Sequence, residues 1–566
     1  MRSDTRNLLI CCGLVLLTVA AAGPVLEMGL IDDFSYTYTA RELAATGRLR
    51  YYGTGPMLGA QVWFAALVIR LFGFSFTAVR LTTAFFAVGC AILIYRIGRT
   101  VGLKPAFACL ATLTVVLSPL FVPLAVSFMT DVPALFFLLL CFFCGSRALA
   151  SSDTLGCAAW LTAAGISGVA GGTVRQVIWG APLSVIPMIG WIRRADKRIA
   201  VSAGLLFIAS AAAVAGCLIW LSRQPYLEGN RLPNGIGEVL AIFRNVQTFA
   251  SLIRTGLLFL LPVLMVFFAG WWKRWPSGIA WICAGVAAVL GIVPLVFGDR
   301  NFPFGDIVTV TGILQEGVDA IGTKVVILAP RTLAFLSFMT LAASAAGIVA
   351  LAHGRSKGDA EVDRSRAVQM LLMSAPFHLG YLFILLYRAH FARTFDRYLL
   401  PLLPAAALML LWLYQQRIRD RVPLIGWLAA AAFGLYGVAT THDYLAAARA
   451  RLAAASALTS AGVPRTSITA GLEYDGWTQI ESGGYLNSPF IRFPANAYMR
   501  RADDSYPPGL WYDLWPFTPT ITPEYFVVYS RQPMLVDTEY PPITYRAWLP
   551  FSIRSVYLQR RLTARD

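Results

Sequence analysis

Long apolar runs dominate this chain of 566 residues and constrain what it can fold into. A helix that crosses a bilayer needs about 20 mostly apolar residues. With 57% hydrophobic and only 14% charged residues, the composition excludes a water-soluble globular protein, in which about 25% of residues are charged. The sequence therefore predicts a polytopic α-helical membrane protein with about thirteen transmembrane helices, at 8–30, 77–95, 105–122, 131–149, 157–172, 177–192, 199–221, 252–271, 277–297, 325–351, 367–387, 398–414 and 422–442.

The first apolar run shares features with a secretory signal peptide, because Arg2 and Arg6 precede it and Ala20 and Ala22 resemble a cleavage site. Its apolar part is longer than the usual 7–15 residues of such signals. We therefore expect the run to stay in the protein as a membrane anchor.

The formal net charge of +17 arises mainly in the apolar part of the chain, which favours a topology signal over a nucleic-acid surface. Basic residues gather in short loops on the cytoplasmic side of membrane proteins. Placing the N-terminus inside puts several basic groups in short inner loops, and thirteen spans then put the C-terminus outside. An even number of spans would reverse the C-terminal side. The inner basic groups are Arg193-Arg194 with Lys197-Arg198, Lys273-Arg274, Arg355 to Arg366, and Arg417 to Arg421.

Two regions have room to form structure outside the membrane. Residues 31–76 form a long first outer loop, whose second half, Pro56–Gly73, is apolar but short and predicts a helix lying in the membrane interface. Residues 443–566 begin with an Ala/Arg-rich helical stretch and continue with β-prone pieces such as Tyr525 to Tyr529. We expect a transmembrane catalytic module at 1–442 and a small extracytoplasmic α/β domain at 443–566.

Cysteine and histidine patterns predict no disulfide framework and no ligand-spaced metal pair. All nine cysteines lie in or beside apolar runs, and the four histidines are scattered. Cys141 and Cys144 stand three apart within such a run, where small buried hydrophobic residues are the better interpretation. Carboxylates could still hold a divalent cation, although the sequence shows no such site.

An acidic pair, Asp32 and Asp33, provides the first polar side chains after the first span. At the depth of the lipid headgroups, a carboxylate can take a proton from a hydroxyl nucleophile. Adjacent residues on a helix do not share a face, so both are not expected to serve one reacting atom. We assign Asp33 mainly to capping a helix that starts at Phe34, and Asp32 as the candidate general base.

Asp131 lies at the outer start of the fourth span, in the segment Met129-Thr-Asp-Val-Pro133. An acidic residue followed by proline is an ordinary helix start. A carboxylate at the edge of a span is nevertheless costly enough to be a candidate functional residue.

Two basic segments could hold a phosphate by paired hydrogen bonds. Arg175 and Gln176 interrupt an apolar stretch after a pair of glycines, although an arginine at a helix end often only reaches toward the interface. Arg388, Arg393 and Arg397 lie on the expected outer side, against the positive-inside trend, which suits an anionic headgroup. Arg397 could instead form a surface pair with Asp396 of little energetic weight.

Taken together and in order, these motifs resemble those of bacterial membrane glycosyltransferases of the GT-C superfamily. The most similar group is the protein O-mannosyltransferase-like group, which includes the lipid A aminoarabinose transferase. The motifs that carry the resemblance are Asp32-Asp33 followed by Tyr36 and Arg41-Glu42-Leu43, Asp131 in Met-Thr-Asp-Val-Pro-Ala, Arg175-Gln176, Arg397 to Pro404, and Gly471 to Gly476.

Two departures concern the sugar. The aminoarabinose transferase has a Glu-Lys-Pro in its first outer loop, where this chain reads Gly53-Thr-Gly-Pro-Met57, and its lysine after the fifth span is replaced by Arg175. The resemblance therefore supports the general reaction and not aminoarabinose as the sugar.

The resemblance implies a GT-C fold and an inverting transfer of sugar from a polyprenyl-phosphate donor to a hydroxyl of a cell-envelope lipid, glycan or protein, at the outer face of a bacterial inner membrane. Asp32 would be the base, and Asp131 would orient the acceptor or share the proton network. Further substrate contacts would come from Asp33, Tyr36, Arg175, Gln176, Arg393, Arg397, Glu473 and Asp475.

Two other function classes fit a polytopic chain with basic outer loops. A polyprenyl-glycolipid transporter would suit the many spans, but no inverted repeat or paired broken helices are visible, and the carboxylates cluster on one side of the membrane. A protein that only binds such glycolipids without catalysis would have the same sequence signature.

Overall fold

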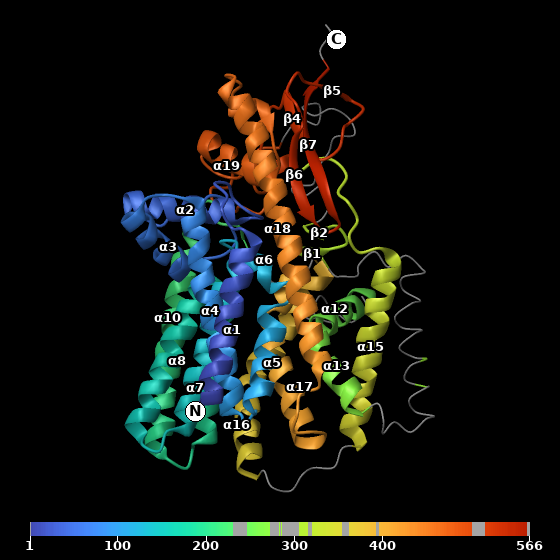
Figure 1. The fold of residues 1–566 in the computed structure, drawn as a ribbon. Helices are drawn as coiled ribbons and strands as arrows, with labels where there is room; N and C mark the ends of the chain where they lie inside the picture. The colour runs from blue at the N-terminus through green and yellow to red at the C-terminus, as the bar shows by residue number, and fades with distance from the viewer. Residues whose placement is uncertain are drawn as a thin grey trace.

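The computed structural model describes residues 2–229, 246–271, 282, 285, 305–314, 320–353, 361–391, 395–500 and 515–562. A bundle of roughly parallel helices forms one part of the molecule, and a small domain with a β-sheet covers one end of it (Figure 1). Eight helices in the described part are long and apolar enough to cross a membrane. They are α1 (Arg2–Ala22), α4 (Phe76–Thr100), α7 (Asp131–Ala150), α8 (Thr154–Val174), α10 (Lys197–Ser222), α15 (Pro330–His353), α16 (Glu361–Phe391) and α18 (Leu424–Ser460).

The remaining apolar runs form shorter or broken helices, so the expected number of thirteen spans is not confirmed. A pair of helices bent by 74° at residue 260 corresponds to the run at 252–271 and would bring the number of spans to nine. The run predicted at 277–297 lies almost wholly outside the described residues. The shorter elements are α5 (Pro105–Val116), α6 (Phe121–Ala125), η1 (Gln176–Trp179), α9 (Gly180–Ile192), α12 (Val246–Phe259), α13 (Leu261–Trp271), η4 (Asp396–Leu399) and α17 (Leu403–Arg417).

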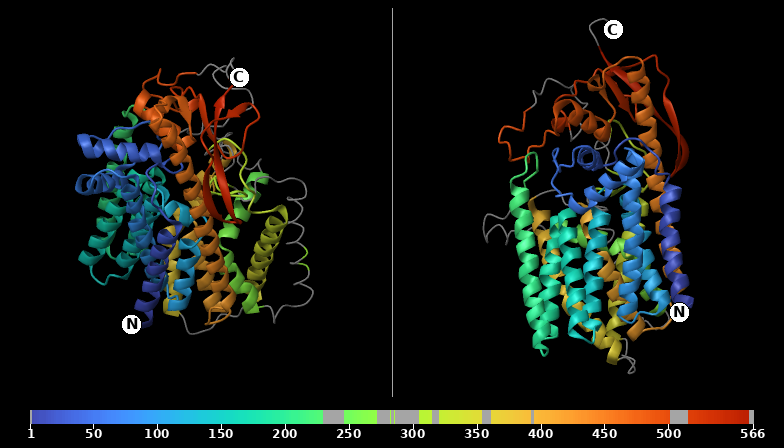
Figure 2. Two further views of the ribbon diagram at one scale, coloured as in Figure 1. Left: turned by 45° about the horizontal axis from the view of Figure 1, so that its top comes forward. Right: turned by 90° about the vertical axis from the view of Figure 1, so that its left-hand side faces the viewer.

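The first outer loop contains two helices, α2 (Asp33–Thr46) and α3 (Gly59–Phe72). Both lie across the ends of the spanning helices (Figures 1 and 2). Arg70 near the end of α3 donates to the carbonyl oxygen of Ala44 at 2.9 Å and so fixes α3 to α2. The interfacial helix expected at Pro56–Gly73 is confirmed as a helix, and its orientation fits a position at the membrane surface.

The C-terminal domain contains a mixed sheet beside the upper part of α18, as the sequence predicted for a small α/β domain. Within the sheet, β3 pairs with β4 in parallel, while β4, β5 and β6 each pair with β7 antiparallel. Because α18 runs without a break from the bundle into this domain, the predicted boundary at residue 442 falls inside one helix (Figure 1). The elements are β3 (Ile468–Thr469), α19 (Leu472–Gly483), β4 (Tyr525–Val528), β5 (Leu535–Asp537), β6 (Ile543–Trp548) and β7 (Phe551–Arg561).

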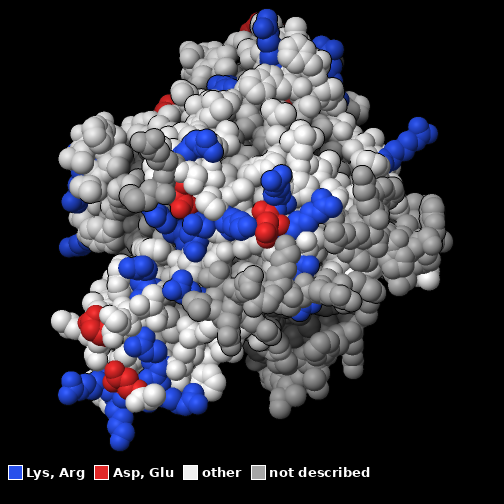
Figure 3. Space-filling view, turned by 60° about the horizontal axis from the view of Figure 1, so that its bottom comes forward, with Lys and Arg blue, Asp and Glu red and all other residues white. Residues whose placement is uncertain are grey.

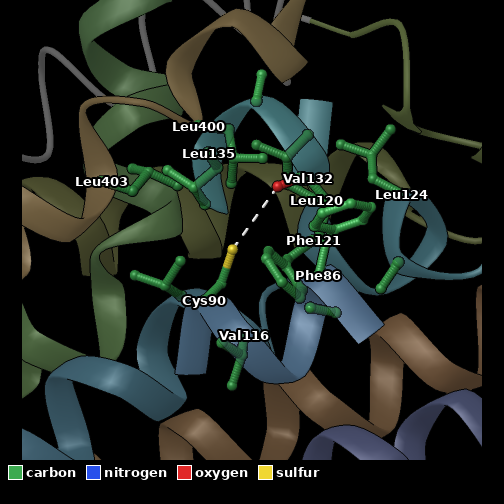
Figure 4. Packing of buried hydrophobic residues seen from close by; sticks show 14 of the residues in the cluster. Phe86, Cys90, Val116, Leu120, Phe121, Leu124, Val132, Leu135, Leu400 and Leu403 are labelled. Atoms are coloured by element: carbon green, nitrogen blue, oxygen red, sulfur yellow. Dashed lines mark hydrogen bonds between the residues drawn. The ribbon is translucent and has the colours of Figure 1, made fainter. Parts of the chain in front are cut away.

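A continuous apolar core lies beneath the polar ends of the bundle. Figure 4 shows part of it, where Leu120, Phe121 and Val132 pack near Leu400 and Leu403. The thiol of Cys90 in α4 contacts the carbonyl oxygen of Val132 at 3.7 Å. This packing holds the start of α7 close to η4 and α17, and it thereby places two candidate site segments side by side. Cys141 and Cys144 also belong to this core, as expected for small buried hydrophobic residues.

Basic side chains gather at the end of the bundle opposite the C-terminal domain. The space-filling view of that end shows many Lys and Arg side chains and few acidic ones (Figure 3). Exposed basic residues in the connections there include Lys197 and Arg198 at the start of α10, and Arg417, Arg419 and Arg421 between α17 and α18. The described chain thus has one basic end and one end that carries the sheet domain.

Candidate active site

The backbone just before α2 is strained and strongly held. Ile31 adopts a left-handed conformation with φ of 59°, which is unfavourable for a β-branched residue. Its amide donates to the hydroxyl of Tyr444 in α18 at 3.3 Å, and the amide of Leu30 donates to Asp33 at 2.6 Å. These contacts fix the position from which Asp32 extends.

The structure corrects the expected role of Asp33 as a helix cap. The helix begins at Asp33, and Asp32 occupies the cap position without a side-chain capping bond. The buried Asp33 carboxylate instead accepts from the amides of Leu30 and Phe128, the latter at 2.8 Å. Burial raises the pKa of Asp33 to about 6, although the Arg80 charge and both amides lower it. Asp33 therefore anchors the loop before α7 to α2.

A second contact holds the same loop. Gln61 in α3 is fully buried, and its amide nitrogen donates to the carbonyl oxygens of Phe128 and Met129 at 2.9 and 3.3 Å. Because this loop leads directly into α7, Asp33 and Gln61 together determine where Asp131 lies. Sequence reasoning missed Gln61, since a single glutamine in an apolar helix carries no distinguishing signal.

Asp32 forms an ion pair with Arg397, at 3.2 Å between Oδ2 and Nη2. The Asp32 side chain is 43% exposed, whereas that of Arg397 is only 8% exposed. The Nε of Arg397 also lies 3.1 Å from Asp306, a carboxylate that sequence reasoning did not single out. The guanidinium is thus held between two acidic groups, and the carboxylate of Asp32 faces solvent.

Asp131 forms the second ion pair, with Arg175 at the end of α8. Here the carboxylate is the buried partner, with 2% exposure against 20% for the arginine. Oδ2 of Asp131 has no hydrogen-bond partner in the part of the chain that the structure describes. A buried polar atom without a partner is rare in native proteins and costs about 1–3 kcal/mol. It is a position where a substrate group or water would be stabilising.

Aromatic side chains join the two ion pairs. The guanidinium of Arg175 lies 4.7 Å from the ring centre of Tyr398, and those of Arg388 and Arg397 lie 5.1 and 5.9 Å from it. Tyr36, one helical turn after Asp32, is buried among the same charges. Burial raises the pKa of its hydroxyl well above its usual range, the Asp32 charge raises it further, and the Arg397 charge lowers it. We call Asp32, Tyr36, Asp131, Arg175, Asp306, Arg397 and Tyr398 the polar cluster.

Asp396 holds two segments of the polar cluster in place by hydrogen bonds. Its carboxylate accepts from the amides of Ile307 at 3.1 Å, Val308 at 2.8 Å and Arg397 at 2.8 Å. It therefore fixes both the segment that carries Asp306 and the residue that pairs with Asp32. Burial raises the pKa of Asp396 to about 7, the neighbouring Asp306 charge adds to the rise, and the three amides oppose it. The alternative interpretation of Asp396 and Arg397 as a surface pair is wrong, since both side chains are buried.

The segment after α10 adds a carboxylate that sequence reasoning missed. Glu228 accepts from the hydroxyl of Ser488 in the C-terminal domain at 2.6 Å, and its amide donates to Thr54 in the first outer loop at 2.8 Å. Burial raises the pKa of Glu228, the Ser488 bond lowers it, and the Asp32 charge raises it. Gln176, a predicted contact, donates to the carbonyl oxygen of Gly55 in the same loop at 3.1 Å.

Two acidic residues predicted to contact the acceptor lie away from the polar cluster. Glu473 and Asp475 in α19 are fully buried, so neither offers a surface to an acceptor. Glu473 pairs with Arg451 at 3.1 Å and accepts from Tyr444, while Asp475 accepts from Thr469 at 2.6 Å and from the amide of Ala470 at 3.0 Å. Glu473 thereby holds α19 against α18 and, through Tyr444, supports Ile31, whereas Asp475 fixes the start of α19 to the end of β3. Arg393 lies outside the described residues.

The described residues contain no metal-binding group, and the cavity at the C-terminal sheet is not part of the polar cluster. Its His, Cys, Asp and Glu side chains form no group of three or more that could hold a metal ion. A cavity of about 230 Å³ between α18 and the C-terminal sheet is lined by none of the polar cluster. The cluster thus offers one exposed carboxylate, arginines for an anion and a buried acceptor oxygen, which together can deprotonate a hydroxyl and hold a phosphate.

Comparison with known proteins supports the resemblance for part of the chain. Residues 52–225 match the family described as dolichyl-phosphate-mannose-protein mannosyltransferase. This confirms the resemblance to membrane glycosyltransferases over the segment that contains Asp131, Arg175 and Gln176. No curated protein matches the sequence.

Solved structures of membrane glycosyltransferases show low similarity. ArnT from Cupriavidus metallidurans in the apo state is 13% identical with a TM-score of 0.36, covering 82% of this chain and 83% of that one. The same protein bound to undecaprenyl phosphate is 13% identical with a TM-score of 0.34, covering 80% and 79%. The S. cerevisiae Pmt1–Pmt2 complex bound to the sugar donor is 16% identical with a TM-score of 0.31, covering 38% and 33%. These three TM-scores are all below 0.5.

Proposed function

We propose that this protein is an inverting glycosyltransferase that moves a sugar from a polyprenyl-phosphate donor to a hydroxyl of a cell-envelope lipid, glycan or protein. The single observation that carries the proposal is the polar cluster, in which the exposed carboxylate of Asp32 lies 3.2 Å from the buried guanidinium of Arg397. The family match at residues 52–225 supports a polyprenyl-phosphate sugar as the class of donor.

Asp32 would act as the general base. Its carboxylate takes the proton of the acceptor hydroxyl while the acceptor oxygen forms a bond to the anomeric carbon. The bond between that carbon and the phosphate oxygen breaks, and polyprenyl phosphate leaves. One displacement inverts the anomeric centre. A positioned base of this kind is typically worth about 10²–10⁴ in rate.

The arginines would hold the leaving phosphate. Arg175 is the better placed, because 20% of its side chain is exposed while its buried partner Asp131 keeps it oriented. Arg397 is more buried, and we assign it to positioning Asp32 and to lowering the electrostatic cost of charge that develops on the phosphate. The unpartnered Oδ2 of Asp131 would accept a hydrogen bond from the acceptor or share its proton network.

We also propose that the polar cluster and the C-terminal domain face the outside of a bacterial inner membrane, with residues 1–442 as the membrane module and 443–566 as the extracytoplasmic domain. The basic end of the bundle supports this orientation, because positively charged loops stay in the cytoplasm (Figure 3). A protease-accessible tag inserted after residue 566, tested on spheroplasts, would be cleaved from outside.

Transfer can be tested with purified protein in nanodiscs, supplied with a panel of polyprenyl-phosphate sugars and envelope extract. The wild type should consume one donor selectively, and Asp32→Asn should not. Glu481→Gln is the matched control, because Glu481 is also an exposed carboxylate paired with an arginine, Arg41 at 3.3 Å, but outside the polar cluster. It should behave as wild type.

The same samples separate the proposal from its alternatives. If no donor is consumed and a labelled glycolipid crosses proteoliposome bilayers instead, the protein is a transporter. If donors bind without consumption or translocation, it is a binding protein. If Asp32→Asn turns over as fast as the wild type, the assignment of the base is wrong even though transfer is established.

A further inference from the structure

Apolar side chains are exposed at one end of the C-terminal sheet, where a soluble domain would bury them. The β6–β7 hairpin turns at residues 549 and 550, and beside the turn Trp548 is 40% exposed, Phe551 85% and Ile553 73%. Trp548 pairs with Phe551 across the hairpin, and Arg546 pairs with Ile553. Because residues two apart on a strand share a face, these four side chains form one surface, apolar near the turn and basic farther from it.

The turn points toward the membrane bundle. The hairpin lies beside α18, and its turn reaches the level where the spanning helices end (Figures 1 and 2). Asp443 in α18 fixes this arrangement, since its carboxylate accepts from the amides of Trp548 at 2.7 Å and Leu549 at 2.8 Å. His442 stacks on the Trp548 ring with the ring centres 4.0 Å apart. The turn is therefore attached to α18 at a defined depth.

A separate contact between α18 and the end of α1 shows the level of the turn relative to the spanning helices. Arg449, six residues or about 9 Å farther along α18, donates to the carbonyl oxygen of Gly23, the residue that follows α1. A helical side chain leans toward the N-terminus of its helix, which moves this contact back toward Asp443. Asp443 and the turn thus lie close to the level at which the apolar helix α1 ends.

From these observations we propose that the tip of the β6–β7 hairpin inserts into the headgroup region of the bilayer, in the leaflet on the side of the C-terminal domain. Trp548, Phe551 and Ile553 contact the acyl-chain boundary, and Arg546 lies at the level of the lipid phosphates. Tryptophan is enriched at this depth in membrane proteins, where one end of a side chain meets lipid and the other meets water.

This contact links the membrane to the polar cluster. Asp443 holds the hairpin, and the next residue, Tyr444, accepts from the amide of Ile31 directly before Asp32. The C-terminal domain is thereby anchored to the bilayer at a second place besides α18. The insertion stands without the proposed transferase activity, because it follows from exposure and depth alone.

Site-specific quenching tests the insertion in the full-length protein. Phe551→Cys would be labelled with bimane and reconstituted into nanodiscs of phosphatidylcholine or of its chain-brominated form. The matched controls are Thr544→Cys, four residues up β6 from Trp548, and Glu539→Cys, an exposed residue near Asp537. Asp537 pairs with Gln559, which lies eight residues or about 26 Å along β7 from Phe551. The wild type treated with bimane gives the background from native cysteines.

The expected result is quenching by brominated lipid at residue 551 that exceeds that at residue 539 by about threefold or more, with residue 544 between them. Equal quenching at 551 and 539 would overturn the proposal and leave a protein partner or a second copy as what covers the apolar surface. If Phe551→Cys does not fold, Ile553→Cys on the same face gives the same comparison.

Discussion

The two ion pairs of the polar cluster have the same composition and opposite exposure. In the pair of Asp32 and Arg397 the acid is 43% exposed and the arginine 8%, whereas in the pair of Asp131 and Arg175 the acid is 2% exposed and the arginine 20%. A reacting molecule that enters the site meets a carboxylate in the first pair and a guanidinium in the second. The buried partner in each pair orients the exposed one.

From this difference in exposure we infer that the two ion pairs contact different substrates. An exposed carboxylate can accept a proton, and an exposed guanidinium can hold a phosphate, so one pair would serve the acceptor and the other the donor. Exposed ion pairs contribute little to stability, and removing one partner of a buried pair costs much more. Substitutions in the two pairs should therefore have different ratios of catalytic to structural effect.

The largest effect is expected for Asp32→Asn. Turnover of the donor should fall by about 10²–10⁴ because the proton acceptor is lost. The melting temperature should stay close to that of the wild type, since the side chain is half exposed. Steady-state kinetics with thermal unfolding in the same detergent would check both. A variant that loses stability as much as activity would show that Asp32 is a structural partner of Arg397.

Asp131→Asn should have the opposite effect, with a larger loss of stability and a smaller loss of turnover than Asp32→Asn. We expect a loss of about 1–3 kcal/mol in the free energy of unfolding, because Arg175 then lacks its buried charged partner. The loss of turnover should be smaller than for Asp32→Asn. Unfolding in a mixed-micelle denaturant series measures the first quantity. If Asp131→Asn were as stable as the wild type but inactive, the two carboxylates would exchange roles.

Arg175→Lys tests the donor side of the comparison. Lysine keeps the charge but loses the planar fork that binds a phosphate with two hydrogen bonds. The KM for the donor should rise about tenfold, equivalent to about 1.4 kcal/mol, with a smaller change in kcat. Arg70→Lys, which alters an arginine outside the cluster that binds backbone carbonyls, is the control for a general effect of the substitution. Equal effects of the two variants would argue against a phosphate contact.

The stability of the folded protein should also depend on pH through Asp396. Burial raises the pKa of Asp396 to about 7, so the folded protein binds that proton more tightly than the unfolded chain does. The resulting stabilisation is fully present below the unfolded pKa of about 3.9 and is lost as pH rises toward 7. The melting temperature of the wild type relative to Asp396→Asn should therefore decrease between pH 5 and pH 8. A difference that does not change with pH would show that Asp396 stays ionised throughout.

Some of the site could be predicted from the sequence because its signals are local. Asp32, Asp131 and Arg175 each interrupt an apolar run at the edge of a span, where a charge is costly. Glu228 and Asp306 lie in longer polar segments, where a carboxylate is ordinary, so nothing in the sequence distinguished them. Glu473 and Asp475 matched a motif, yet they are buried, and a motif does not show which of its side chains face solvent.

The sequence by itself determined the membrane bundle, the interfacial helix of the first outer loop and the small C-terminal α/β domain, since apolar length and β-prone composition act over neighbouring residues. Only the tertiary structure decided that Asp32 pairs with Arg397, 365 positions away, and that Asp33 holds the loop before Asp131. It also placed the turn of the β6–β7 hairpin beside Asp443 of α18, close to the level at which α1 ends. Contacts of this kind depend on how helices pack around a shared core, and no periodicity along the chain encodes them.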